Sequence, residues 1–271
     1  MLGQRTALVG WKPPRRRIFM SDSDMFDAAR AAGSPIEQAV AVFMLHPDTF
    51  AESIEAGYEH PFAGYVAGRA GVLGETTGVT VHSVFAVFEP SFIHGMWETG
   101  IAVRGAIGAA ELYWDQVAGF ARKYLAAATG LDRIAALGEK IIAATPDAGL
   151  PLYAGWRTMA LADDAAARAL QVMFVLRELR AGVHFNALSI SGITPVEAHM
   201  LNKGHEYTTM FGWPEPFADG TDKKDRYAAV EEATNRRMAE IFGAALDGGE
   251  ADELARLSTA ALATLKASAA S

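Results

Sequence analysis

Cysteine is absent from the 271 residues of the chain. This excludes disulfides, thiolate metal ligands and a cysteine nucleophile. Long apolar runs are absent too, because Glu, Arg, His or Gly interrupts each run well before the roughly 20 residues that a transmembrane helix needs. The N-terminal stretch RTALVGWKPPRRRIF has neither the apolar core nor the cleavage site of a signal peptide. These absences predict a cytoplasmic protein with no membrane partner.

Positive charge is scarce. The chain has 24 Lys and Arg against 32 Asp and Glu, a net charge of −8. Nucleic-acid-binding proteins collect phosphates with a basic face, but basic residues cluster here only in KPPRRR, within residues 1–33, which we expect to form a partly flexible N-terminal arm. No Lys or Arg occurs from Ala70 to Val103 or from Ala181 to Asn202. This distribution argues against nucleic acid as a partner.

The remaining pattern is helical. Ser34-Pro35-Ile36-Glu37 and Thr194-Pro195-Val196-Glu197 both have the form of a capping box with proline at the first helical position, so each predicts a helix start. The run between Gly105 and Gly130 lacks proline and is rich in alanine, which predicts one long helix that ends at a glycine cap. The β-branched residues of GVTVHSVFAVF would also suit a strand, and we interpret this segment as a helix.

Further helices are expected in the second half of the sequence. LDRIAALGEKIIAA predicts a short one, and Asp222 or Asp225 is expected to cap another. The apolar stripe of a last helix comprises Leu254, Leu257, Ala261 and Leu265. The segments GLPLYAGW and FGWPEPFADGTDKKD predict loops that are too short for flexible linkers. We therefore predict an all-α, multi-helix domain in which helical halves, residues 34–150 and 151–271, share a core.

Two segments of the sequence share a pattern. Residues 68–85 and 179–200 both contain Arg-Ala-Gly-Val followed by Gly-Val-Thr or Gly-Ile-Thr. One interpretation is a duplicated unit, in which Arg69 and Arg180 are equivalent and converge on a pocket between the halves. The other is a chance match, because short patterns recur in chains rich in alanine and glycine.

Several motifs together resemble a known family. The segments YVAGRAGVLG, FAVFEPSFIHGMWE, LRELRAGVH and GITPVEAHML, followed by a Gly-Trp pair, are similar to a large actinobacterial family of all-helical proteins labelled helix-turn-helix or EvbL-like. The resemblance covers residues 47–246 at the level of motifs. It implies an all-α scaffold with winged-helix-like halves. In place of the family's second helix and wing-like turn, the segment after Trp213 reads PEPFADGTDKKD.

The central motif of that family reads Leu-Arg-Glu-His-Arg-Gly-Asp-Gly-His. The residues of this chain that match its charged positions and its last histidine are Arg177, Glu178, Arg180 and His184. The chain differs from the motif at Leu179, Ala181, Gly182 and Val183. The resemblance thus singles out the same charged residues that stand out in the apolar run from Gln171 to Leu188.

The charged residues of this run allow three interpretations. On a helix, Arg177, Arg180 and His184 fall in one row, and a helix that is apolar on nearly every side is normally buried. Because a buried arginine must be paired, the arginines could form a structural network with carboxylates. The candidate partners are Glu178, Glu197 and Glu98. Alternatively the arginines hold an anionic ligand in a cavity while His184 transfers a proton, or the row faces solvent.

Two other pairs are candidates. His94 and Glu98 lie four residues apart and could form an acid–base pair or a structural pair. Tyr65 and Arg69 have the same spacing in GYVAGRAGV, where the alternative to ligand binding is a buried tyrosine held by a local hydrogen bond. The sequence has no HExxH motif, no clustered carboxylates and no nucleotide-binding fingerprint, so we expect no metal and no cofactor, although a single haem-ligating histidine needs no motif.

The favoured hypothesis is a small-molecule-binding, all-α protein with a helix-turn-helix-like scaffold, extended to a cofactor-independent acid–base enzyme of specialised metabolism. Its substrate would be anionic or carry a carbonyl group. The proposed catalytic residues are His184, His94 and Glu98, and the proposed substrate-binding residues are Arg177, Arg180, Arg69 and Tyr65. The alternative is a ligand-responsive, DNA-binding transcription regulator. The apolar stripes could also close on a second subunit, which would make the protein a homodimer.

Overall fold

The computed structural model describes residues 22–270, with side chains from residue 24 onward, and this part of the chain contains helices and no strands. The α-helices are α1 Asp22–Met44, α2 Pro47–Glu55, α3 Pro61–Ala70, α4 Gly78–Phe85, α5 Pro90–Tyr124, α6 Leu131–Ala144, α7 Pro151–Trp156, α8 Ala165–Ser191, α9 Pro195–Lys203, α10 His205–Met210, α11 Lys224–Ala245 and α12 Gly248–Ala269. Two 3₁₀ turns, η1 Gly71–Leu73 and η2 Thr221–Lys223, complete the order. The predicted all-α fold is confirmed. No helix in these residues has the length and apolar character to cross a membrane.

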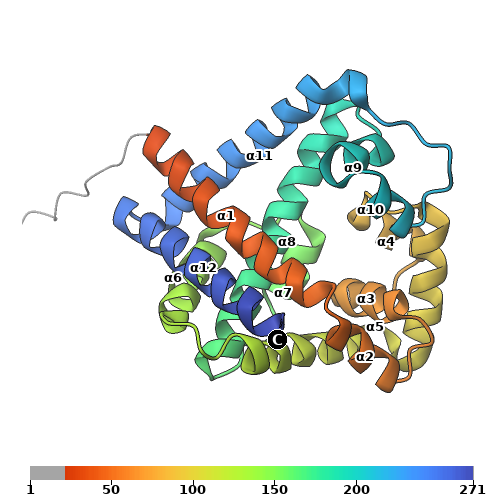
Figure 1. The fold of residues 1–271 in the computed structure, drawn as a ribbon, viewed down its shortest axis with the longest axis horizontal. Coiled ribbons are helices and arrows are strands. Elements are labelled where there is room, and N and C mark those ends of the chain that lie inside the picture. Colours follow the sequence, from red (N-terminus) through yellow and green to blue (C-terminus); the bar gives the residue numbers. More distant parts are fainter. Residues whose placement is uncertain (1–21, 271) are drawn as a thin grey trace, which may run out of the picture.

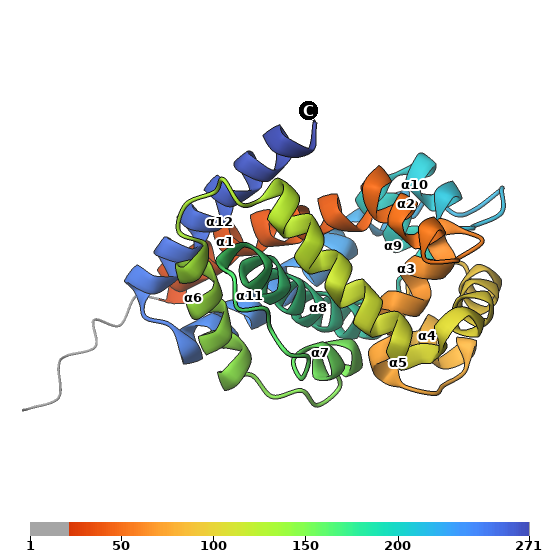
Figure 2. The same ribbon diagram turned by 90° about the horizontal axis from the view of Figure 1, so that it is seen from below.

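Helix α8 lies at the centre of the molecule (Figures 1 and 2). It packs against α1, α5, α6, α7 and α11, and this position explains why its sequence is apolar on nearly every side. The largest hydrophobic cluster of the described residues includes side chains of α1, α3 to α8, α11 and α12. Both expected halves contribute to this cluster, while the boundary between them at residue 150 stays a prediction.

The helix start expected at Ser34 is wrong, because α1 continues through Pro35. The Ser34 hydroxyl accepts a hydrogen bond from Gln38 Nε2 at 3.1 Å. Proline inside a helix costs about 3 kcal/mol. Here the buried stripe continues on both sides of the proline, through Ala32 and Ile36, and packs along α11 and α12. Burial of this stripe outweighs the local cost, and residues 22–33 belong to α1. The expected basic arm, KPPRRR, lies outside the described residues.

The long helix expected after Gly105 begins where predicted but ends earlier. Arg104 and Gly105 have non-helical backbone angles, with φ +71° at Gly105, so α5 is interrupted there. The helix then ends at Tyr124 and not at the expected glycine cap. Gly130, with φ +76°, is instead the residue directly before α6. The left-handed glycine therefore serves the turn between the helices.

Other local predictions are confirmed. The segment GVTVHSVF forms α4, LDRIAALGEKIIAA forms α6 with the expected bounds, and the predicted stripe of α12 is buried. The capping box at α9 is present, with the Thr194 N–H donating to Glu197 Oε2 at 3.0 Å.

Two predictions are wrong in segments that connect the long helices. Neither Asp222 nor Asp225 caps α11, because its N-cap is Lys223 and no side chain caps it. The expected loop GLPLYAGW contains α7, where Trp156 is fully buried and its indole N–H donates to the Arg69 carbonyl at 3.0 Å. Burial of this tryptophan makes a short helix stable in a segment whose composition suggests a loop.

Candidate functional site

Charged side chains of α8 contact other helices on two sides. Glu178 contacts α3, and Arg180 and His184 contact α11. Arg177 donates to Glu178 and also lines a cavity on the side of α1 and α11. The row predicted from the sequence therefore divides into two groups of charges.

The first group is a buried ion pair between helices that are distant in the sequence. Arg69 Nε donates to Glu178 Oε1 at 2.8 Å and Nη2 donates to Oε2 at 2.9 Å, and the side chains are 2% and 0% exposed. Arg69 Nη1 also donates to Tyr65 Oη at 3.0 Å. This is the local hydrogen bond that the sequence suggested as the alternative to ligand binding by Tyr65. The bidentate geometry fixes α3 against α8.

A second arginine binds the same carboxylate. Arg177 Nη1 donates to Glu178 Oε1 at 2.8 Å. Burial raises the pKa of Glu178, but Arg69 and Arg177 outweigh this effect and the net pKa is lowered. Two guanidinium groups on one carboxylate leave an excess of one positive charge. Nearby, the buried Tyr113 hydroxyl has no hydrogen-bond partner among the described residues, and burial raises its pKa.

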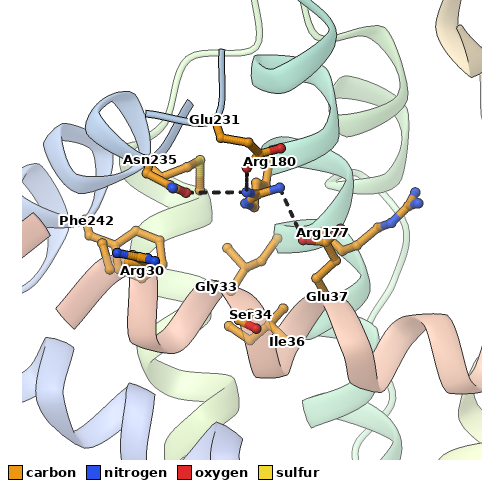
Figure 3. A pocket seen from close by; sticks show the side chains of 13 residues that line it. Arg30, Gly33, Ser34, Ile36, Glu37, Arg177, Arg180, Glu231, Asn235 and Phe242 are labelled. Atoms are coloured by element: carbon orange, nitrogen blue, oxygen red, sulfur yellow. Dashed lines mark hydrogen bonds and ion pairs between the residues drawn. The ribbon is translucent and has the colours of Figure 1, made fainter. Parts of the chain in front are cut away.

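The second group joins α1, α8 and α11. Arg180 Nη2 donates to Glu231 Oε2 at 3.0 Å and to Asn235 Oδ1 at 3.3 Å. Arg180 Nη1 lies 3.2 Å from Glu37 Oε2. Figure 3 shows these three contacts converging on the guanidinium group from α1 and α11. The structure therefore supports the interpretation in which arginines of α8 pair with glutamates.

His184 lies beside this second group. Its Nδ1 is 3.3 Å from Thr234 Oγ1 and 3.4 Å from Glu231 Oε1. Burial lowers the pKa of His184, Glu231 opposes this shift and Arg180 reinforces it, so that the net pKa is lowered. The residues that line the adjacent cavity include Glu231 but not His184. A ligand in that cavity would reach the imidazole through the carboxylate.

A cavity of about 320 Å³ lies between α1, α8 and α11. Its lining residues are Ala29, Arg30, Gly33, Ser34, Ile36, Glu37, Leu176, Arg177, Arg180, Glu231, Asn235, Met238 and Phe242. Three arginines and two glutamates give the lining a net charge of +1. Arg30 is exposed, and no hydrogen bond or ion pair reaches it from any described residue (Figure 3). We call this space the first cavity.

Comparison with known proteins identifies the family. The model of a helix-turn-helix family matches residues 29–271. The chain belongs to this helix-turn-helix family. No curated protein and no solved structure matches the chain. Since unrelated functions occur on one fold, the name describes the scaffold, and the site has to be argued from its own residues.

In this helix-turn-helix protein, the pair His94 and Glu98 is not joined. His94 is half-buried on α5, with its ring 6.2 Å from that of His82. Glu98 is exposed. No hydrogen bond or ion pair connects the two among residues 22–270. Their catalytic role stays a prediction from their spacing.

Of the three expected carboxylate partners, one is confirmed. Glu178 pairs with Arg177. Glu197, at the start of α9, pairs with Lys223 instead. Among the described residues, Glu98 pairs with neither Arg177 nor Arg180. The duplication also stays a prediction: Thr80 of the first pattern lies inside α4, whereas Thr194 of the second caps α9.

Sequence reasoning missed the site residues that α1 and α11 supply. On α11, polar residues that contact Arg180, His184 or each other recur at helical spacing; they are Tyr227, Glu231, Thr234 and Asn235. This inward polar face was a signal that could have been found, because it interrupts the apolar stripe of an otherwise amphipathic helix. No group of three or more His, Asp or Glu with metal-binding geometry occurs among the described side chains.

Proposed function

We propose that the protein binds a small organic anion in the first cavity. The observation that carries the proposal is the guanidinium group of Arg30, which has no partner among the described side chains, on a lining that has one excess positive charge. The volume of about 320 Å³ falls at the lower end of the range for ligand pockets, about 300–1,000 Å³. A compact ligand with one carboxylate group matches this size and charge.

The lining of the first cavity has a polar part and an apolar part. Ile36, Leu176, Met238 and Phe242 offer an apolar surface to the body of a ligand. Arg180 is held by Glu37, Glu231 and Asn235, so it fixes the relative positions of three helices. Under this proposal Arg30 carries the anionic group and Arg180 positions the lining, whereas the guanidinium group of Arg177 points away from Arg30 toward Glu178 (Figure 3).

The extension to an acid–base enzyme is supported by one geometric relation. Glu231 lines the first cavity, and its Oε1 lies 3.4 Å from His184 Nδ1. A proton could therefore pass between a ligand and the imidazole through this carboxylate. In this proposal Glu231 is the group that contacts the substrate, and His184 acts through it.

Thermal unfolding tests the binding proposal. The probes are benzoate and its neutral analogue benzamide. At a concentration about 100-fold above Kd, a ligand stabilises the folded protein by about 2.7 kcal/mol, which raises Tm by roughly 5–10 °C in a chain of this size. We expect benzoate to raise Tm and benzamide to have little effect.

Two variants assign the effect to the first cavity. Arg30→Gln removes the cation that has no partner among the described residues, and Arg256→Gln removes another exposed cation, on α12, that does not line the cavity. We expect Arg30→Gln to reduce the benzoate effect and Arg256→Gln to retain it in full. An equal loss in both variants, or stabilisation by benzamide alone, would contradict the proposal.

Family membership favours a second candidate, the DNA-binding regulator. Helices α9 and α10 are joined through Gly204 alone, as a tight helix–turn–helix. However, α10 contains no Lys or Arg, and such residues supply the phosphate contacts on which affinity depends. The segment after α10 also packs against residues 87–89, where the Phe88 and Phe211 rings stack at 3.8 Å.

Retention of labelled DNA across a salt series tests this candidate. The fragments are the promoter region of the protein's own gene and a random control. We expect no retention of either fragment, even at low salt, because phosphate contacts are lacking. Specific retention at physiological salt would establish the regulator and overturn the argument from charge.

A further inference from the structure

A second cavity lies on the opposite side of the charged row of α8. It has a volume of about 210 Å³ and lies among α4, α7 and α8. Its lining includes Arg69, Val84, Leu150, Glu178, Ala181 and Phe185. The buried Arg69–Glu178 pair thus borders a space that is large enough for a small molecule.

The charges beside this cavity are not balanced. Glu178 accepts hydrogen bonds from both Arg69 and Arg177, and the charges that act on Glu178 come from these two arginines. Arg177 is partly exposed and can be hydrated, but Arg69 is buried and has to share its carboxylate with Arg177. An anion that enters this cavity would therefore add negative charge beside a buried arginine, where charges need partners.

Arg69 also has N–H groups that its hydrogen bonds to Glu178 and Tyr65 do not use. A guanidinium group has five N–H donors, and three of them are used, two toward Glu178 and one toward Tyr65. The Arg69 side chain is only 2% exposed to solvent. The two remaining N–H groups belong to a buried side chain that borders the second cavity, and guanidinium groups bind carboxylates well.

The rest of the lining restricts the ligand. Val84, Leu150, Leu152 and Phe185 provide apolar surface. Apart from Glu178, which is already paired, no acidic residue lines the cavity. Cations are disfavoured by the excess positive charge.

We propose that the second cavity binds a small carboxylate with an apolar body, held by Arg69. This site is separate from the first cavity and does not rest on the function proposed for it. The two sites lie on opposite sides of the Arg177–Glu178 contact, so each can be filled or blocked by itself.

Nuclear magnetic resonance of the arginine side chains tests the proposal. The Nε–H of Arg69 is buried and hydrogen-bonded to Glu178, so its signal should be protected from exchange with water. Benzoate and benzamide are titrated into the ¹⁵N-labelled full-length protein. We expect benzoate to shift the Arg69 signal in a saturable way and benzamide to leave it in place.

Blocking variants locate the binding. Ala181→Leu fills the second cavity from α8, and Val84→Phe fills it from α4, while Arg69 and Glu178 are retained. We expect either variant to raise the Kd reported by Arg69 at least about tenfold. Gly33→Ala, which narrows the first cavity, is the matched control and should leave this Kd unchanged.

The outcomes separate the two sites. If benzoate does not shift the Arg69 signal, or if both blocking variants bind as the wild type does, the second site is refuted. A shift confined to Arg30 would overturn the second site and support the first. A shift of Arg69 that survives Arg30→Gln supports the second site whatever the fate of the function proposed above. The unliganded Arg69 signal, if unchanged in the blocking variants, shows that their fold is intact.

Discussion

Replacing Glu178 by leucine should destabilise the protein strongly, because the change leaves a buried arginine without its carboxylate. Arg69 and Glu178 share two hydrogen bonds, and their side chains are 2% and 0% exposed. Removing one partner of a buried pair costs about 3–5 kcal/mol. Since Arg69 would keep only Tyr65 as a partner, we expect a loss of unfolding free energy near the upper end of this range.

Removing Arg69 should reduce the free energy of unfolding less than removing Glu178 does. Arg69→Met leaves Glu178 bound to Arg177, so we expect a loss near the lower end, about 3 kcal/mol. The double variant Arg69→Met/Glu178→Leu leaves only Arg177 unpaired, and this side chain is 21% exposed and can be hydrated. Because apolar replacement of a whole buried pair is often neutral, the double variant should lose at most about 1–2 kcal/mol.

Urea unfolding followed by circular dichroism gives the free energy of unfolding of the four proteins. The double variant should lose much less than the sum of the single losses. Arg236→Met and Glu232→Leu provide the control cycle, because this ion pair is 69% and 52% exposed and should couple by less than about 0.5 kcal/mol. Single losses that simply add to about 7 kcal/mol or more, or a negligible effect of Glu178→Leu, would refute the reasoning.

Three further changes have defined outcomes. Gly33→Ala places a methyl group inside α1 with Arg180 Cδ as its nearest neighbour at 3.9 Å, so we expect a higher Tm and a gain of about 0.5–1 kcal/mol; a lower Tm would contradict this. Gly71→Ala brings a methyl group to 2.1 Å from the Ala106 carbonyl oxygen and should cost about 1–3 kcal/mol or more in urea unfolding. Burial lowers the pKa of His199 to about 4, so the unfolded chain takes up the proton first and stability is lost as pH falls from about 6.5 toward 4. His199→Leu should remove this loss, about 3 kcal/mol, from the pH profile of unfolding; an unchanged profile would contradict it.

Helices whose signals are local could be predicted from the sequence. The capping box at Thr194 lies within one turn of the helix that it starts, so no distant residue is needed to interpret it. The same sequence form at Ser34 fails, because contacts of α1 with α11 and α12 favour one continuous helix. Two motifs of one form therefore differ in outcome through their tertiary surroundings. Local sequence does not contain that information.

Of the candidate site, only the residues on α8 could be predicted from the sequence. The sequence shows that Arg177 and Arg180 need partners, since buried guanidinium groups must be paired. The partners of Arg180 come from Glu37 and Glu231, on α1 and α11, and the latter is 51 residues away. A single sequence offers no signal for such a pairing. The existence of a cavity beside the pair depends on side-chain packing and is equally non-local.

The motif that links the chain to its family is directed inward. Glu178 is buried between Arg69 and Arg177, Arg180 is held by glutamates, and His184 is buried. None of these side chains is placed to contact a phosphate backbone. A change in this motif should therefore first affect the stability of the fold and the anion binding that we propose for the two cavities. Any effect on DNA binding would be indirect. The helix-turn-helix scaffold of this chain thus supports a charged interior, in which these side chains pair with one another between helices.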